Sequence, residues 1–216
     1  YWAMGMPSQR VFWAPNAVTA APTELPPDRP ASFAGKPVVL FVGRLQARKR
    51  IDLLLEACAA LPAEIQPRLL IVGDGPDRAE MEAQAERTYP SAEFPGAKYG
   101  AELAATFKQA DLFVLPGTGG LAVQQALCYA LPAIVAQGDG TQEDLVRSGN
   151  GWLVPPGDLQ ALGQALQEAL SDARRLRRMG ARGYHIVSEE VNLGMMVGGF
   201  LFAAERVLEL GLRQRG

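Results

Sequence analysis

The stretch LFVLPGTGGLAVQQALCYALPAIVA, from Leu112 to Ala136, decides the fold of this chain. Leu112–Leu115 is a continuous apolar run, which is typical of a strand buried on both faces. A glycine-rich loop follows, and apolar residues then recur at helical spacing from Leu121 to Ala130, before a proline. A second apolar, β-branched run, Pro132–Ala136, closes the stretch. The stretch therefore predicts a strand, a glycine loop, a helix and a second strand.

The glycine loop contains Gly117, Gly119 and Gly120. Such a loop lets a ligand approach the main chain and presents free N–H groups at the positive end of the helix dipole. A phosphate or a sugar oxygen would suit that position. Isolated glycine signatures are weak, so a tight strand–helix connection without a ligand is an equally good interpretation of the loop alone.

Strand and helix patterns alternate along most of the chain. Strands are expected at Val38–Val42, Arg68–Val72, Ala92–Phe94, Leu112–Leu115, Pro132–Ala136 and Gly151–Val154. Helices are expected at Ile51–Leu61, Pro76–Tyr89, Ala101–Gln109, Leu121–Ala130 and Gln142–Arg147, and in a helical region from Asp158 onward that is broken near Gly180 and Gly183. This alternation predicts an α/β fold, a three-layer sandwich with a parallel sheet between two layers of helices.

The two ends of the chain carry weaker signals. Residues 1–36 are expected to be a leading segment or interdomain linker packed on the domain, with a short strand at Val11–Trp13. Residues 37–216 are expected to form the Rossmann-like α/β domain, with a helical carboxyl terminus. The last helical pattern, Val191–Leu212, has one strongly apolar face interrupted by glycines, so it needs tertiary packing to persist. It could pack on this domain, cross to another domain, or lie on a lipid surface, the last being disfavoured because its polar face has no basic excess.

The composition excludes several classes of function. The chain has 216 residues and a formal net charge of −2, so no basic field favours nucleic acid. Cys58 and Cys128 lie in apolar helical patterns without metal-ligand spacing, which indicates buried, reduced thiols in a cytoplasmic protein. The longest apolar stretch, Leu193–Ala204, is too short to span a bilayer. The single histidine, His185, is expected to be a surface or packing residue.

Among the charged residues, Arg44 and Lys49 are the strongest candidates for binding a ligand. Both follow the first predicted strand, and the carboxyl ends of parallel strands gather the ligands of such sheets. Arginine offers a fork to phosphate oxygens, and lysine offers a compact charge. Judged by charge alone, simple solvation is the better interpretation of both residues. Residues 73–76, Gly-Asp-Gly-Pro, favour a turn before a helix over a ligand loop.

The order of these pieces resembles the carboxyl-terminal domain of retaining glycosyltransferases of family 4, also called glycosyl transferases group 1. The resemblance rests on Pro15-Asn16 and on the segments VGRLQARKRIDLLLEA, LLIVGDGPD, FPGA, ADLFVLPGTGGLAVQQALCYALPAIVA and SGNGWLVPPGD, and it covers nearly the whole chain. It implies one Rossmann-like half of a GT-B fold. The half that is absent would bind an acceptor sugar or lipid-linked glycan, and residues 37–216 would bind a nucleotide-sugar donor.

The resemblance also implies site residues. Arg44 and Lys49 match a basic pair that resembles a clamp for the donor diphosphate, which would be their catalytic role. The positions implied for donor binding are Gly43, Gly117, Gly119, Gly120, Leu121 and Gln125. Relatives carry glutamates where this chain has Gly117 and Gln125. An amide at 125 can still bind ribose hydroxyls, whereas Gly117 cannot replace a carboxylate.

The sequence therefore predicts a glycosyltransferase, resembling hexosyltransferases, that transfers a sugar from a nucleotide diphosphate with retention of configuration. No metal or cofactor is expected, because two cations can stabilise the leaving diphosphate. The expected localisation is cytoplasmic, with peripheral membrane attachment left open for a full-length protein and no transmembrane segment expected. The alternative is a catalytically inactive nucleotide-binding or regulatory module of the same fold.

Overall fold

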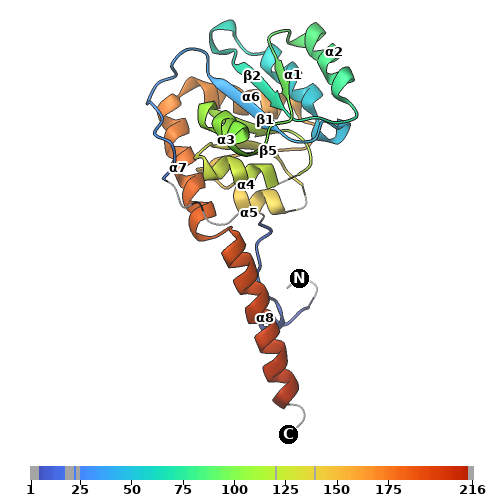
Figure 1. Cartoon of the computed structure of the whole chain (residues 1–216), viewed down its shortest axis with the longest axis vertical. Helices are drawn as coiled ribbons and strands as arrows, with labels where there is room; N and C mark the ends of the chain where they lie inside the picture. The colour runs from blue at the N-terminus through green and yellow to red at the C-terminus, as the bar shows by residue number, and fades with distance from the viewer. Residues whose placement is uncertain (1–4, 18–21, 23–24, 120, 139, 214–216) are drawn as a thin grey trace.

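A six-stranded parallel sheet forms the centre of the molecule (Figure 1). The computed structural model describes residues 5–17, 22, 25–119, 121–138 and 140–213. The strand order is β3-β2-β1-β4-β5-β6, which reverses direction between β1 and β4. The strands are β1 (Val38–Val42), β2 (Arg68–Val72), β3 (Glu93–Gly96), β4 (Leu112–Leu115), β5 (Ala133–Ala136) and β6 (Gly151–Val154). All six predicted strands of the α/β domain are present, with small shifts at the ends of β3 and β5.

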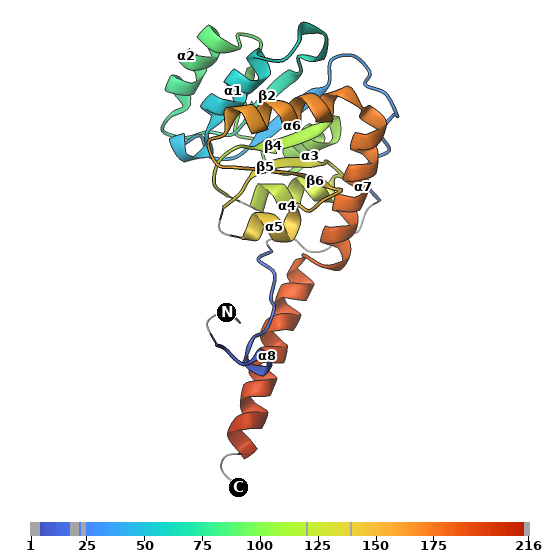
Figure 2. The ribbon, with the colours of Figure 1, turned by 180° about the vertical axis from the view of Figure 1, so that it is seen from behind.

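Helices cover both faces of the sheet, as Figures 1 and 2 show from opposite sides. Helices α1 (Ile51–Ala59), α2 (Arg78–Thr88) and α6 (Leu159–Ser171) pack together on one face. The other face carries α3 (Gly100–Gln109), α4 (Leu121–Cys128), α5 (Thr141–Leu145) and α7 (Ala173–Glu189). Short 3-10 turns occur at η2 (Ser8–Arg10), η3 (Ala47–Lys49) and η4 (Ala63–Ile65). The predicted three-layer sandwich is therefore confirmed.

The central strands are buried on both faces because their apolar runs are continuous. Strands β4 and β5 are buried at every residue, and β1 pairs with β2 in register from Val38–Arg68 to Val42–Val72. Both faces of such a strand must be apolar, since helices cover them. Of the two cysteines, Cys58 is buried as predicted, whereas Cys128 is only half-buried.

The predicted breaks near Gly180 and Gly183 are wrong, because α7 runs unbroken through both glycines. A Cβ at Gly180 would lie 2.0 Å from the Ala130 carbonyl oxygen, and one at Gly183 would lie 2.7 Å from Leu127 Cδ2. The glycines let α7 approach the end of α4 closely. The helical region instead breaks at Asp172 and between Glu190 and Asn192.

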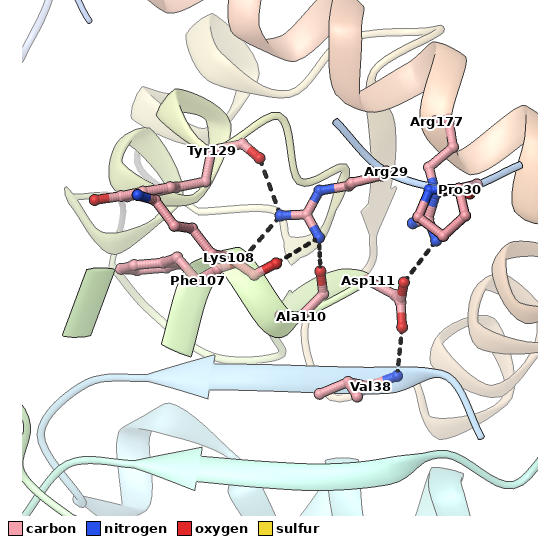
Figure 3. Close-up of polar contacts among 9 residues, drawn as sticks. All are labelled: Arg29, Pro30, Val38, Phe107, Lys108, Ala110, Asp111, Tyr129 and Arg177. Carbon is pink, nitrogen blue, oxygen red and sulfur yellow. Dashed lines mark hydrogen bonds and ion pairs between the residues drawn. The ribbon is translucent and has the colours of Figure 1, made fainter. Parts of the chain in front are cut away.

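One arginine of the leading segment joins the ends of two helices (Figure 3). The Arg29 guanidinium donates to the carbonyls of Phe107 at 3.0 Å, Lys108 at 3.2 Å and Tyr129 at 3.2 Å, and also to that of Ala110. These carbonyls lie at the carboxyl ends of α3 and α4, where a cation also complements the helix dipoles. Burial, and then the charge of a neighbouring arginine, lowers the Arg29 pKa to about 10, so the group stays protonated at neutral pH.

The neighbouring arginine, Arg177, continues this anchor. It forms an ion pair with Asp111 at 2.7 Å, and its Nε donates to the Pro30 carbonyl at 2.9 Å. The second carboxylate oxygen of Asp111 accepts from the Val38 N–H at 2.8 Å. Val38 begins β1 and Asp111 directly precedes β4, so the leading segment is fixed at the amino ends of the strands, on the rim opposite the glycine loops.

Helix α8 (Leu193–Arg213) projects away from the domain, with the leading segment running beside it (Figures 1 and 2). The Phe12 ring packs edge-on against the Phe202 ring at 5.7 Å, and a Cβ at Gly199 would lie 2.5 Å from the Trp13 carbonyl oxygen. The predicted strand at Val11–Trp13 is wrong. This tripeptide is apolar because it contacts a helix.

Most of α8 is exposed, so of the three arrangements that the sequence leaves open for this helix, the structure does not show packing wholly on this domain. Its large exposed apolar residues are Leu193, Met195, Val197, Phe200, Leu201, Phe202, Val207 and Leu208. The helical stretch Ala173–Glu209 contains a window that is long and apolar enough to span a membrane, and only 11% of that window is buried. This finding corrects the expectation that the apolar stretch is too short. Length and composition alone do not distinguish a membrane span from a helix that docks on protein.

Candidate functional site

The loops that follow β1 and β4 flank the point where the strand order reverses. Ligands of open α/β sheets bind in the crevice outside the carboxyl ends of the strands at such a point. Gly43, Arg44 and η3 follow β1, and Pro116–Gly119 follows β4. The topology therefore places Lys49, at the end of η3, and the glycine loop at the same crevice.

The loops after β1 and β2 are joined by main-chain hydrogen bonds. Gly43 N–H donates to the Val72 carbonyl at 3.0 Å, and Leu45 N–H donates to the Asp74 carbonyl at 2.9 Å. A Cβ at Gly73, where φ is +149°, would lie 1.8 Å from the Gly43 carbonyl oxygen. Only glycine allows this approach. The chain turns at Pro76 and Asp77 before α2, whereas Gly73 and Asp74 form part of the wall of the crevice.

Lys49 is held directly against the glycine loop. Its Nζ donates to the Thr118 carbonyl at 2.6 Å, and the Thr118 N–H donates to the Arg48 carbonyl at 3.1 Å. A Cβ at Gly119, where φ is +136°, would lie 2.6 Å from Lys49 Nζ. The loop therefore has no side chain at 119 that could separate the ammonium from a ligand resting on the loop backbone.

Burial, and then the charge of Arg48, lowers the pKa of Lys49. Both causes disfavour the charged ammonium. An anion bound beside Lys49 would oppose both effects, so the crevice favours a negatively charged ligand. Arg48 also contributes directly, because its Nη1 donates to the Thr118 hydroxyl at 3.3 Å.

Arg44 lies in a cavity of about 460 Å³ at the ends of β1, β2 and β3. Gly43, Asp74 and Gln125 also line this cavity, together with Lys98 and Tyr99 of the loop between β3 and α3. A cavity of this size suits a nucleoside. A larger cavity of about 540 Å³ adjoins it at Leu103 and Gln125, under the leading segment. The smaller cavity is the better candidate, because it holds the charged groups and lies at the strand ends.

Position 117 has no space for a side chain. A Cβ there would lie 2.2 Å from the Arg48 carbonyl oxygen and 2.6 Å from Lys49 Cα. The main chain of η3 therefore fills the direction in which a side chain at 117 would point. Gly117 is required for the loop to pack on η3, which explains why no carboxylate is found at this position.

The structure divides the candidate residues between two parts of the crevice. Lys49, Gly117 and Gly119 meet at the glycine loop, whereas Gly43, Arg44 and Gln125 line the cavity. Leu121, 44% exposed, begins α4 beside the loop. Gly120 lies outside the described residues.

Sequence reasoning missed several residues of this crevice: Arg48, Asp74, Lys98, Tyr99, Thr118 and Gln142. Lys98 and Tyr99 could have been found, because they follow a predicted strand end. Arg48 lies in a run of basic residues in which nothing local distinguishes it, and Gln142 carries no local signal. His185 is exposed, as predicted, with Nδ1 3.6 Å from a Glu189 carboxylate oxygen.

A parallel sheet with ligand-binding geometry at its topological switch point defines a Rossmann-like α/β domain. The sequence profile of "Glycosyl transferases group 1" matches residues 26–186. The chain belongs to this family, as the sequence resemblance predicted.

Its relatives are considerably longer than this chain. A "GDP-mannose-dependent alpha-mannosyltransferase" from Mycobacterium tuberculosis is 34% identical over 199 residues, which cover 88% of this chain and 49% of the relative. A protein of the same name from Corynebacterium glutamicum is 32% identical, with coverages of 88% and 43%. The chain thus spans about half the length of the curated relatives it matches.

Solved structures of GT-B glycosyltransferases share the fold. A sucrose-phosphate synthase from Thermosynechococcus elongatus has a TM-score of 0.67 and 29% identity, with 87% of this chain and 46% of that chain covered. HepE from Anabaena, solved in complex with UDP, has a TM-score of 0.68 and 22% identity, with coverages of 82% and 50%. This domain is therefore one Rossmann-like half of a GT-B fold.

Proposed function

We propose that this domain binds the nucleotide-diphosphate sugar donor of a retaining glycosyltransferase. The observation that carries the proposal is the contact of Lys49 with the glycine loop at the topological switch point. There, an ammonium and a glycine-rich loop can hold a diphosphate, while the cavity of about 460 Å³ at the strand ends has room for the nucleoside. The relatives named for GDP-mannose and the structure containing UDP support a donor of this class.

In this mechanism Lys49 and Arg44 stabilise negative charge as it develops on the leaving diphosphate. The Gln125 amide, on the wall of the cavity, accepts and donates hydrogen bonds to ribose hydroxyls. We propose that a second domain, outside residues 1–216, holds the acceptor sugar or lipid-linked glycan. A cleft enzyme needs both walls to orient its two substrates, so the 216-residue chain alone should bind donor without transferring sugar.

The full-length protein provides the test. A thermal-shift screen against nucleotide sugars, followed by calorimetry with GDP and UDP, should find one nucleoside diphosphate that binds in preference to the other. The full-length protein should then release that diphosphate when acceptor is present, and the anomeric configuration of the product, read by NMR, should be retained. An inverted product would rule out the retaining mechanism.

A second candidate function is nucleotide binding without catalysis. Position 117 favours it, because the sequence resemblance implies a carboxylate there, and this loop has no room for one. Full-length protein that binds a donor but neither transfers nor hydrolyses sugar across the screen would support this function. Absence of any nucleotide binding would exclude both candidates.

A further inference from the structure

Gln142 of α5 holds the glycine loop through a contact that is separate from those of η3. Its Nε2 donates to the Gly119 carbonyl at 2.8 Å, and the residue is only 1% exposed. Helices α4 and α5 lie side by side, so the first turn of α5 reaches the loop that precedes α4 (Figure 1). Gly138 leaves space for this amide, since a Cβ there would lie 3.0 Å from both Nε2 and Oε1.

The hydrogen bond to the Gly119 carbonyl fixes the orientation of the Gln142 amide. A carbonyl oxygen accepts only from a donor, so the NH₂ end must face Gly119. The other end, Oε1, is buried and has no hydrogen-bond partner among the described residues. Burying an amide with one end unsatisfied costs free energy. The hydrogen bond to the Gly119 carbonyl is the contact that offsets this unfavourable burial.

The glycine loop needs such an anchor. Gly119 adopts a φ of +136°, and glycine loses more conformational freedom on ordering than any other residue. Lys49 also holds the loop, through the Thr118 carbonyl. An ammonium that turns toward a diphosphate weakens that contact just when the loop must stay in place. Gln142 has no such second role.

We propose that Gln142 is a positioning residue for the donor diphosphate, holding the Gly119 peptide in the conformation that the phosphates meet. The inference rests on the proposed donor-binding function. It predicts that loss of the amide donor weakens the binding of phosphate groups, because the loop must then be ordered when the ligand binds. The binding of a nucleoside without phosphates should be unaffected.

The chain offers a matched control. Gln124 is also 1% exposed, and its Nε2 donates to the Val191 carbonyl, again at 2.8 Å. Gln142→Glu and Gln124→Glu make the same chemical change at two equally buried amides, of which Gln142 donates to the Gly119 carbonyl and Gln124 to the Val191 carbonyl. Gln142→Met and Gln124→Met remove the donor without adding charge, and they serve if the glutamate variants do not fold.

In full-length protein we expect Gln142→Glu and Gln142→Met to weaken binding of the preferred nucleoside diphosphate about tenfold, the effect of one hydrogen bond. Competition NMR with the corresponding nucleoside should give affinities within about twofold of wild type. The Gln124 variants should bind both ligands like wild type. Folded Gln142 variants with unchanged diphosphate affinity, or with equal losses for nucleoside and diphosphate, would overturn the inference.

A readout without ligand separates this inference from the proposed function. Amide hydrogen exchange of ligand-free protein should accelerate at Thr118 and Gly119 in Gln142→Met and stay unchanged there in Gln124→Met. Accelerated exchange in a protein that binds no nucleotide would leave Gln142 as an anchor of the loop while the donor-binding function fails. Unchanged exchange at the loop would contradict the anchor itself.

Discussion

At the scale of single residues, the sharpest prediction concerns Lys49. Its ammonium touches the glycine loop, and a charge-assisted contact to phosphate contributes about 1.5–3 kcal/mol. Lys49→Met should therefore weaken binding of the nucleoside diphosphate by that amount in calorimetry, and Arg44→Ala should have a similar effect. Lys36→Met is the control, because Lys36 is exposed and precedes β1 at the opposite rim.

The same lysine predicts a pH dependence of binding. Lys49 attracts a diphosphate only when protonated, and burial lowers its pKa from the ordinary value. The contribution of Lys49 is complete below the lowered pKa and is lost as pH rises through it. The affinity for the diphosphate should therefore fall in the wild-type protein as pH rises from neutral to alkaline. It should fall less steeply in Lys49→Arg, because arginine stays protonated over this range. A steep fall that persists in Lys49→Met would assign the titration to another group.

The two cysteines should differ in reactivity. Burial raises the pKa of the Cys58 thiol to about 12, so almost no thiolate forms near pH 8, and the side chain is fully buried. Cys128 is half-buried and lines the cavity of about 540 Å³. A thiol reagent added to native protein should modify Cys128 and spare Cys58, as peptide mass spectrometry can show. Modification of Cys58 at a comparable rate would mean that the core around α1 opens readily.

At the scale of elements, glycines inside helices have opposite roles in α6 and α7. A Cβ at Gly180 of α7 would collide with the Ala130 carbonyl, whereas a Cβ at Gly163 of α6 meets nothing within 4 Å. Gly180→Ala should destabilise the domain by about 1–3 kcal/mol through overpacking. Gly163→Ala should stabilise it by about 0.5–1 kcal/mol, because alanine favours the helix. Urea denaturation measures both, and equal effects at the two positions would refute the close packing of α7 on α4.

The same contrast shows what the sequence could predict. The strands could be predicted because a strand buried on both faces is a continuous apolar run in the sequence, as in Leu112–Leu115. The breaks at Gly180 and Gly183 were wrong because propensity is local, whereas the reason for these glycines is a neighbouring helix. The strand predicted at Val11–Trp13 was wrong for the same reason, since the helix that this tripeptide contacts, α8, lies at the far end of the chain.

The candidate site follows the same rule. Lys49 and the glycine loop could be brought together from the sequence, because the carboxyl ends of parallel strands share one rim. Gln142 could not, since it lies in the first turn of α5 and not at a strand end, so no rule of sheet topology places it beside the Gly119 carbonyl. Arg29, which joins the ends of α3 and α4, lies in a segment without periodic pattern and was also beyond local reasoning.

At the scale of the whole molecule, the leading segment and α8 lie side by side outside the domain (Figures 1 and 2). The leading segment crosses α8 at Gly199, and the apolar face of α8 is left open on a helix that extends away from the sheet (Figure 2). A contiguous exposed apolar face of this kind marks an interaction surface. We propose that it docks on a second domain of a longer protein, which is one of the arrangements that the sequence leaves open for this helix.

The last prediction follows from that open face. Without a covering partner, the 216-residue chain should associate through α8, because water contact with the apolar face is unfavourable. Phe200 and Leu208 are 63% and 68% exposed, so Phe200→Lys with Leu208→Lys should shift the chain toward monomer in light scattering. Leu25→Lys is the control, since Leu25 is 90% exposed but lies outside α8. Binding to neutral-lipid vesicles that both α8 substitutions abolish would instead assign the face to a membrane. A wild-type chain that stays monomeric and binds no vesicles would show that α8 packs back onto its own domain in solution.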